Sequence, residues 1–428
     1  MSTTRKTPKL RFPEFTDDWE QRKLSSMCDV FTDGDWIEAK DQSDSGIRLV
    51  QTGNVGIAEY LDKENNKKWI SEETFEHLHC SEIYPGDILI SRLPEPAGRA
   101  CILPNIGTRM ITAVDCTIVR SSKEYSSNYL VQYLSTSMYF KTVTAFLAGG
   151  TRQRISRGNL SEIDIPVPPS FEEQQKIGEF FSKIDKLITL HQRELDSLKK
   201  LKKSLLQKMF PKNGEKIPEL RFPEFTGDWE QRKFDDVFNY LAHNSLSRDD
   251  LNDNEGSIKN IHYGDVLIKF GNVIDTKHEY IPYVNDNVKL ENKACFLQDG
   301  DVVIADAAED STVGKCTEIS ESSDQKIVSG LHTIPCRPKN KFAKGFLGYY
   351  LNSNAYHDQL LPLMQGTKVS SISKTSLKET TIKFPSSIEE QKKVGACFHE
   401  LDNLITLHQR ELDTLKKLKK GLLQNMFV

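Results

Sequence analysis

The chain contains EEQQKIGEFFSKIDKLITLHQRELDSLKKLKKSLLQKMF at residues 172–210 and repeats it, without gaps, as EEQKKVGACFHELDNLITLHQRELDTLKKLKKGLLQNMF at residues 389–427. Of the 39 aligned positions 28 are identical, which indicates that one large unit has been duplicated. Apolar residues in each copy recur at alternating steps of four and three, the a/d pattern of a coiled-coil seam. The sequence therefore predicts two long, matching helices.

The predicted seam has the same order of residues in both helices. Its positions are Ile177, Phe181, Ile184, Ile188, His191, Leu195 and Leu198 in the first helix and Val394, Phe398, Leu401, Ile405, His408, Leu412 and Leu415 in the second. A lysine, Lys202 or Lys419, continues each seam. Polar residues at seam positions cost stability but fix register and the choice of partner. Because neither helix can bury its face alone, we expect an antiparallel pair related by a pseudo-two-fold axis; the alternative is that each helix lies separately on its own domain.

A pair of this length would act as a spacer. At 1.5 Å per residue, each helix would be about 58 Å long. That length corresponds to roughly 17 base pairs of DNA. If the two domains read DNA, the target would therefore consist of two unrelated half-sites separated by bases that are not read.

A shorter repeat opens each half of the chain. LRFPEFTDDWEQRK at residues 10–23 returns as LRFPEFTGDWEQRK at residues 220–233, with a single change from Asp17 to Gly227. We call this repeat the box, and we expect its aromatic residues to pack the start of each domain onto a helix end. Between box and helix the copies diverge, except at two short anchors. These are YPGDILI at 84–90 against QDGDVVI at 298–304, and GTRQRIS at 150–156 against GTKVSSIS at 366–373.

The divergent parts are typical of α+β domains. Short β-branched runs lie between Gly, Pro, Asn and Asp turns, and residues 125–146 and 342–364 have a helical apolar pattern. The predicted plan is a variable domain at 1–170, a helix at 171–210, a linker at 211–219, a second variable domain at 220–387 and a second helix at 388–428. The fold class is thus two mixed α/β domains joined by two long helices that form an antiparallel coiled coil.

Composition excludes several classes of protein. The 428 residues are 37% hydrophobic and 28% charged, with a net charge of −4, which is typical of a globular chain of more than one domain. No apolar run approaches the 18 or so residues of a membrane span, and the N-terminus lacks the apolar core of a secretory signal. The eight cysteines show no paired spacing, so we expect reduced thiols in a cytoplasmic protein. DNA binding would depend on local basic patches.

No catalytic or metal-binding constellation stands out in the sequence. We find no N/D-P-P-Y/F adenine-methylase motif, no glycine-rich cofactor loop and no phosphate-binding loop. Asp18, Glu20 and Lys23 suggest a nuclease site, but Glu20 is followed by Gln21-Arg22 instead of the usual acid-x-lysine pair. His77-Leu78-His79-Cys80 lacks further ligands at zinc spacing. We therefore expect no catalytic residue and no metal site.

The order of these elements strongly resembles the DNA-specificity (S) subunits of Type I restriction-modification systems. The resemblance rests on the paired L-R-F-P-E-F…W boxes, the G-D-I/V anchors, the G-T-x-x-x-I-S element and the long E-E-Q-x-K…L-K-K-L-K-K-x-L-L-Q-x-M-F helix after each variable domain. It implies two target recognition domains, each reading one half of a bipartite DNA sequence. The helices would act as spacer and docking site.

The same resemblance implies partners and divides the chemistry among them. Two methyltransferase (M) subunits would bind to form the modification enzyme, and two motor-nuclease (R) subunits would complete the restriction enzyme. S-adenosylmethionine would belong to M, and ATP with Mg²⁺ to R. The chain itself would bind double-stranded DNA without catalysing a reaction.

Candidate DNA contacts follow from the chemistry of base readout, which requires Arg, Lys, Asn, Gln or Ser at base edges and basic groups at phosphates. The strongest stretch is GGTRQRISR at residues 149–157, with three arginines and a glutamine beside a glycine turn. The candidates are Lys67, Lys68, Arg92, Arg99, Arg152, Gln153, Arg154 and Arg157 in the first domain and Lys315, Lys368, Ser370 and Ser371 in the second. Each could instead belong to a solvated loop or a structural turn, and we expect the LKKLKK runs to be solvated helix flanks.

Two rival functions stay open at this point. One is a single-chain DNA methyltransferase or nuclease with duplicated domains, which the missing motifs disfavour. The other is a protein-only scaffold that carries two ligand domains on a helical spacer. Methyl transfer by the chain alone would favour the first rival, and an absence of salt-dependent DNA binding even with M present would favour the second.

Overall fold

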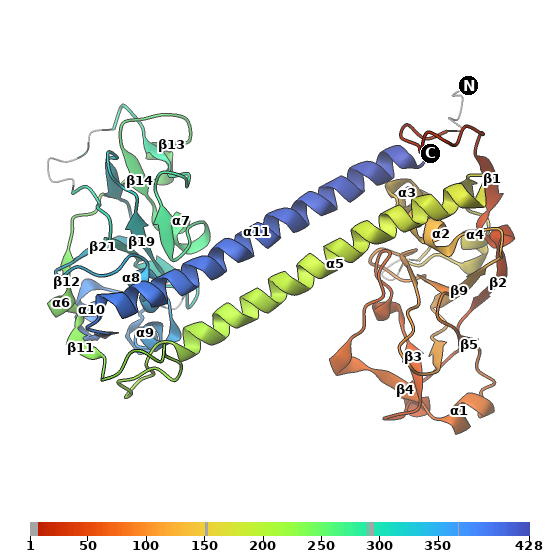
Figure 1. Ribbon diagram of the computed structural model, residues 1–428, viewed down its shortest axis with the longest axis horizontal. Coiled ribbons are helices and arrows are strands. Elements are labelled where there is room, and N and C mark those ends of the chain that lie inside the picture. The colour runs from red at the N-terminus through yellow and green to blue at the C-terminus, as the bar shows by residue number, and fades with distance from the viewer. Residues whose placement is uncertain (1–6, 150–152, 289, 291–294, 367) are drawn as a thin grey trace. The chain divides into compact units, whose positions relative to one another are not determined.

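The computed structural model describes residues 7–149, 153–288, 290, 295–366 and 368–428 (Figure 1). The chain divides into two compact units: unit 1 combines residues 1–193 with 409–428, and unit 2 comprises residues 194–408. Each unit therefore contains one variable domain, the first part of the helix that follows it and the last part of the other long helix. No helix of the described residues is both long and apolar enough to cross a membrane.

Unit 1 is built on two four-stranded sheets. The first is antiparallel with the order β2 (Cys28–Asp33), β9 (Cys116–Ser121), β6 (Ile88–Ser91) and β7 (Ala100–Ile102). The second has the order β4 (Lys68–Ile70), β3 (Ile47–Val50), β8 (Met110–Thr112) and β5 (Glu82–Ile83), with β3 and β8 parallel. The remaining elements are β1 (Glu20–Lys23), paired with β10 (Asp164–Val167), the helices α1 (Glu72–His77), α2 (Ser127–Tyr133), α3 (Ser137–Ala145) and α4 (Arg157–Ser161), and the 3-10 turns η1 (Leu24–Met27), η2 (Ala39–Asp41), η3 (Thr52–Asn54) and η4 (Glu64–Asn66).

Unit 2 repeats this plan with one further strand. Its first sheet has the order β12 (Phe238–Tyr240), β21 (Thr333–Pro338), β17 (Val302–Ala305), β19 (Cys316–Ser320) and β15 (Val273–Asp275). The second has the order β13 (Leu251–Asn252), β16 (Tyr283–Val284), β14 (Lys259–Ile261) and β20 (Ile327–Ser329), with β14 and β20 parallel. The others are β11 (Glu230–Lys233) with β23 (Thr381–Phe384), β18 (Ala307–Ala308) with β22 (Ser370–Ser371), α6 (Phe234–Val237), α7 (Tyr263–Ile268), α8 (Phe346–Leu351), α9 (Asn354–His357), α10 (Lys374–Glu379), η5 (Arg248–Asp250) and η6 (Leu361–Leu363).

The two long helices are continuous over almost the full predicted length (Figure 1). They are α5 (Phe171–Lys208) and α11 (Ile388–Met426). Seam residues at the start of each helix are buried in the core of the preceding domain: Ile177, Phe181 and Ile184 in unit 1, and Val394, Phe398 and Leu401 in unit 2. Leu195 and Leu412 are also buried, whereas Ile188, His191, Leu198, Ile405, His408 and Leu415 are half-buried.

Polar seam residues pair across the helices in both units. In unit 1, Asp185 accepts from Lys419 Nζ at 2.6 Å, and His191 Nδ1 lies 3.4 Å from a Glu411 oxygen. Since the partner's number falls as the residue number rises, the two helices run antiparallel there. Unit 2 shows the same order in the pairs Lys202–Asp402, at 2.5 Å, and Glu194–His408, at 3.4 Å. The predicted antiparallel pairing is therefore confirmed, and the lysines that interrupt the seam have acidic partners on the facing helix.

The box joins each domain to the first turn of its own helix. Arg11 donates two hydrogen bonds to the buried Glu173 carboxylate, at 2.7 and 2.8 Å, and the Trp19 indole N–H donates a third at 3.3 Å. Unit 2 has the same constellation in Arg221, Trp229 and Glu390, with 2.7, 2.8 and 3.1 Å. A carboxylate taken out of water needs paired charge and hydrogen bonds, which explains why Arg, Trp and Glu recur together in both copies.

The box also receives the end of a long helix. In unit 1, Leu10 N donates to Asn425 O at 2.9 Å, and the Phe427 ring lies 6.3 Å from that of Trp19. In unit 2, Leu220 N donates to Lys208 O at 2.8 Å, and Phe210 lies 6.3 Å from Trp229. Each box thus gives an unsatisfied C-terminal carbonyl of a helix a backbone partner.

Two further residues of the repeated helix fix the variable domain. Gln174 accepts from Ser126 N at 3.0 Å, as Gln391 does from Ala343 N at 3.0 Å. Gly178 and Gly395 allow the backbones to touch, because an added Cβ would lie 2.6 Å from Tyr129 N in unit 1 and 2.6 Å from Lys344 O in unit 2. The repeated E-E-Q-x-K-x-G segment is therefore a packing surface that both domains share.

The G-D anchors form equivalent ion pairs at the first sheet of each unit. Asp87 holds Arg120 through two hydrogen bonds of 2.7 Å, and Asp301 holds Arg337 through two of 2.8 Å. The hydrogen bond that each guanidinium donates to its acid raises the pKa of that guanidinium. The same acids accept from the backbone N of Tyr84 and Gln298, so each anchor locks a turn to a neighbouring strand.

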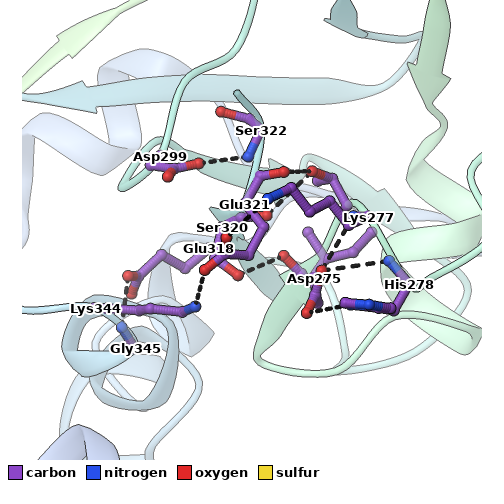
Figure 2. A network of polar contacts seen from close by, with 12 residues as sticks. Asp275, Lys277, His278, Asp299, Glu318, Ser320, Glu321, Ser322, Lys344 and Gly345 are labelled. Atoms are coloured by element: carbon purple, nitrogen blue, oxygen red, sulfur yellow. Dashed lines mark hydrogen bonds and ion pairs between the residues drawn. The ribbon is translucent and has the colours of Figure 1, made fainter. Parts of the chain in front are cut away.

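One buried acid distinguishes unit 2. Glu318 on β19 accepts from the backbone N–H of Gly345 at 2.6 Å and of Gly348 at 2.8 Å, and so caps the start of α8. Figure 2 shows it in one network with the Lys344–Glu321 and Asp275–His278 ion pairs. Burial raises the pKa of Glu318 to about 7, although the backbone N–H groups favour its charged form. In unit 1 the equivalent helix α2 is capped by its own Ser126 side chain instead.

Candidate nucleic-acid interface

Loops gather at one end of the first sheet in each unit. In unit 1, the residues after β6 join neighbouring loops through Arg92 N to Asp115 O, at 2.9 Å, and Ile155 N to Arg92 O, at 3.2 Å. In unit 2 the same bonds run from Asp306 N to His332 O, at 3.0 Å, and from Ile372 N to Asp306 O, at 2.8 Å. We call residues 33–36, 52–57, 92–99, 113–116 and 153–157 loop cluster 1, and residues 263–269, 306–315, 330–333 and 368–372 loop cluster 2.

Two acids organise the arginines of loop cluster 1. Asp33 accepts from Thr117 Oγ1 at 3.0 Å and lies 3.5 Å from Arg92 Nε and 3.8 Å from Arg157 Nε. Asp115 lies 3.9 Å from Arg154 Nη1. Arg154 and Arg157 keep 62% and 46% of their side-chain surface exposed, so these loose pairs orient the guanidinium groups while leaving them open to solvent.

Three of the predicted basic residues support the loops from within. Arg92 is buried and donates to Val114 O at 2.6 Å. Arg99 donates to four backbone carbonyls, those of Thr52, Val55, Leu93 and Pro96, at 2.6–3.0 Å. Lys315, at the equivalent place in unit 2, donates to Leu267 O at 2.8 Å. Burial lowers the pKa of both Arg99 and Lys315, and the geometry gives these side chains a positioning role.

Loop cluster 2 has a different charge pattern. Asp306 stands where unit 1 has Arg92, and it lies 3.1 Å from His332 Nδ1. Glu309 and Asp310 follow and are exposed. Lys368 is exposed, and Ser370 and Ser371 form β22, which pairs with β18 of the same cluster. Equivalent loops therefore present arginine in one unit and a mixture of acid, lysine and serine in the other.

The structure brings most of the candidate contacts together and separates others. Gln153, Arg154 and Arg157 are exposed in loop cluster 1, and Lys368, Ser370 and Ser371 lie in loop cluster 2. Lys67 lies between η4 and β4, 3.3 Å from Asp62, and Lys68 belongs to β4, so both lie outside the clusters. Arg152 lies outside the described residues. Which of these side chains touches DNA stays a prediction.

Sequence reasoning missed the acids of loop cluster 1. It searched for basic and amide residues alone, although exposed arginines need an orienting partner to keep one geometry. The stretch from Asp33 to Asp35 carried a usable pattern, since a strand end rich in Asp and Gly is typical of a turn beside a functional loop. The pairing of Asp33 with Arg157, however, joins residues far apart in sequence.

Comparison with known families identifies these two units. The model of the Type I restriction modification DNA specificity domain matches residues 16–200 and, a second time, residues 226–417. The chain belongs to the Type I restriction-modification specificity-subunit family. The two matched ranges coincide with the two halves of the internal repeat.

One relative aligns along almost the whole chain and a second along about two thirds of it. The MjaX Type I restriction enzyme specificity subunit of Methanocaldococcus jannaschii is 24% identical over 432 residues, covering 97% of this chain and 94% of the relative. The MjaVIII specificity subunit of the same organism is 26% identical over 303 residues and covers 68% of each. The crystal structure of a Type I restriction-modification S subunit from M. genitalium has a TM-score of 0.60 at 15% identity and covers 99% of both chains, which shows the shared fold.

Proposed function

We propose that this specificity subunit reads a bipartite, asymmetric DNA target, with one half-site for each unit and a gap set by the helix pair. The observation that carries the proposal is the contrast between an equivalent framework and unlike loops. Asp87–Arg120 and Asp301–Arg337 hold the two sheets in the same way, whereas the loop clusters at the sheet ends differ in charge. Two domains that share a framework but differ in their base-contacting residues are suited to reading two different short DNA sequences.

The proposed gap follows from the helices. α5 has 38 residues and α11 has 39, and a helix of that length spans about 57 Å, or roughly 17 base pairs. Insertion or deletion of residues within the helices is expected to change the number of unread base pairs while both half-sites stay the same. A changed half-site with an unchanged gap would contradict this part of the proposal.

In the proposed complex the chain binds double-stranded DNA and carries two M and two R subunits. S-adenosylmethionine is used by M, and ATP with Mg²⁺ by R, so this chain supplies recognition and assembly without a cofactor of its own. The repeated helices support a pair of equivalent docking faces. Leu187 and Leu190 of unit 1 keep 45% and 50% exposure, and their equivalents in unit 2, Leu404 and Leu407, keep 41% and 50%.

The docking proposal has a direct test in the mass of the assembled complex. Leu187→Lys with Leu190→Lys is expected to remove one M subunit, because charge would replace an apolar contact on one face only. Leu404→Lys with Leu407→Lys is the matched variant and is expected to remove the other. Retention of two M subunits by both variants in native mass spectrometry would rule out these faces.

The recognition proposal is tested by sequencing the methylated sites of cells that express the chain with its M subunit. The expected result is a single motif with two unlike half-sites around a fixed gap. Purified chain incubated alone with DNA and S-adenosylmethionine is the companion experiment. Methyl transfer without a partner would support the rival interpretation, a stand-alone methyltransferase.

A further inference from the structure

The most exposed apolar side chains of the described chain lie in the loop clusters. Ile268 keeps 89% of its surface exposed, Trp36 70% and Val369 54%, and no other large apolar side chain in the described ranges exceeds these values. Trp36 belongs to loop cluster 1, and Ile268 and Val369 belong to loop cluster 2. Each of these apolar side chains would gain free energy if a bound partner covered it.

The backbone that carries Trp36 is fixed. Gly34 packs so closely on β8 that an added Cβ would lie 2.3 Å from Thr112 O. Asp35 O accepts from Val114 N at 2.8 Å, and the Asp35 carboxylate accepts from Ser81 N at 2.8 Å. Within the part of the chain that the structure describes, the indole N–H donates one hydrogen bond, to the exposed Glu38 at 3.3 Å. A rigid strand end thus presents a largely free aromatic ring next to Asp35, whose backbone bonds Val114, the residue before Asp115.

Ile268 is held in a comparable way. It is the last residue of α7, whose Asp265 pairs with Arg248 through two hydrogen bonds of 2.9 Å, and whose Val266 is buried. Lys315 bonds the carbonyl of the preceding residue, Leu267, and so ties this helix end to the loop after β17. The side chain of Ile268 therefore projects from a fixed position, with Lys269 exposed beside it.

We propose that Trp36 and Ile268 are direct contacts to the two half-sites, one in each unit. This inference rests on the proposed function. An exposed indole in the same loop cluster as Arg154 suits stacking on a base or a deoxyribose, because every base offers an aromatic face. An exposed isoleucine suits apolar contact with the C5-methyl group of thymine in the major groove. The two contacts differ in chemistry, so they add to the asymmetry of the target.

The chemistry favours DNA over a protein partner at these positions. The exposed faces of α5 and α11 carry the same leucines in both units, as expected where identical subunits dock. Trp36 and Ile268 are unlike each other and lie in loops of unlike charge. A surface that serves two different half-sites has this property, whereas a surface that serves two copies of one protein needs equivalent residues.

The test uses the complex of the full chain with its M subunits. The DNA probes are duplex oligonucleotides that carry the target read from the wild-type methylome. Each position of the two half-sites is substituted in turn. Trp36→Ala is expected to weaken binding about tenfold or more and to relax discrimination in the first half-site only, with recovery in Trp36→Phe. Ile268→Ala is expected to relax a thymine preference severalfold in the second half-site only. Ile217→Ala, at an apolar residue outside the clusters that is 47% exposed, is the control and is expected to change neither.

Each outcome decides the inference separately from the proposed function. Unchanged affinity and unchanged discrimination in both variants would overturn the contacts, while the bipartite wild-type motif would still support the proposed function. Loss of M from the complex, seen as a lower mass with DNA discrimination intact, would overturn the inference in favour of protein docking. A wild-type complex that methylates no bipartite motif would instead contradict the proposed function itself. Because both side chains are exposed, thermal unfolding of the variants is expected to match that of the wild type.

Discussion

The junctions between domain and helix differ from the loop clusters in how far the two units agree. At the junctions, Arg11–Glu173–Trp19 and Arg221–Glu390–Trp229 are matched atom for atom. At the loop clusters, Arg92 of one unit corresponds to Asp306 of the other. A duplicated chain keeps the residues that both halves need for the same packing and varies those that face different ligands. The comparison therefore separates the shared framework from the loops to which the proposed function assigns DNA readout.

The largest expected effect is at the junction. Glu173→Ala removes the acceptor of Arg11 and Trp19 from a buried site and is expected to lower the free energy of unfolding by about 3–5 kcal/mol, measured by urea titration. Glu172→Ala is the control, because its pair with Lys176 is exposed and screened by solvent, so its loss is expected to leave unfolding nearly unchanged. Equal effects of the two variants would show that the box does not hold the domain to its helix.

A second expected effect belongs to unit 2 alone and depends on pH. The pKa of Glu318 is about 7, above its ordinary value of 4.5, so the folded state binds its proton more tightly than the unfolded chain does. Its stabilising contribution is full below pH 4.5 and is lost as the pH rises through 7. Relative to Glu318→Gln, the wild type is therefore expected to lose up to about 3 kcal/mol of unfolding free energy across this window.

The control for this pH effect is Glu321→Gln. Lys344 lowers the pKa of Glu321, so its contribution is already complete above pH 4.5 and is expected to stay constant between pH 5 and 8. Urea titrations of the three proteins at several pH values provide the comparison. A constant difference between wild type and Glu318→Gln over the whole range would contradict the proposed protonation.

The third prediction tests the shared packing surface. Gly178→Ala and Gly395→Ala place a methyl group 2.6 Å from backbone atoms and are each expected to cost about 1–3 kcal/mol in thermal or urea unfolding. Gly421→Ala, in the same type of helix with nothing within 4 Å, is expected to stabilise by about 0.5–1 kcal/mol. If Gly421→Ala destabilised the protein and Gly178→Ala left its stability unchanged, the proposed packing surface would be contradicted.

The smallest effect on stability is expected in the loop clusters. Arg154→Ala removes an exposed side chain and is expected to leave unfolding unchanged while costing about 1–3 kcal/mol of DNA binding if the guanidinium reads a base. Lys368→Ala is the counterpart in loop cluster 2. Filter or anisotropy titrations against targets with one altered half-site should show the first variant affecting only the first half-site and the second only the other. Effects of one variant on both half-sites would contradict the assignment of one half-site to each unit.

The sequence alone was sufficient for the framework because that part is repeated. Identical positions in 172–210 and 389–427 exposed the seam, and the matched His and Lys fixed its register. The roles of Arg92 and Arg99 were not predictable, since a basic residue after a glycine is equally consistent with a phosphate contact and a structural bond. Only tertiary packing shows that the Arg99 guanidinium donates hydrogen bonds to four backbone carbonyls. The exposure of Ile268 was not predictable either, because the apolar pattern of a short helix normally indicates a buried position.

The central claim, one half-site for each unit, is tested most directly by replacing residues 220–387 with a second copy of residues 10–170. The repeated box and helix starts make the exchange compatible with the packing at Glu390 and Gly395. Sequencing of the methylated sites in cells that express this chain with its M subunit is then compared with the wild type. The account predicts a motif in which the first half-site occurs twice and the second is lost, with the gap unchanged. Persistence of the original second half-site, or a motif unrelated to either, would contradict it.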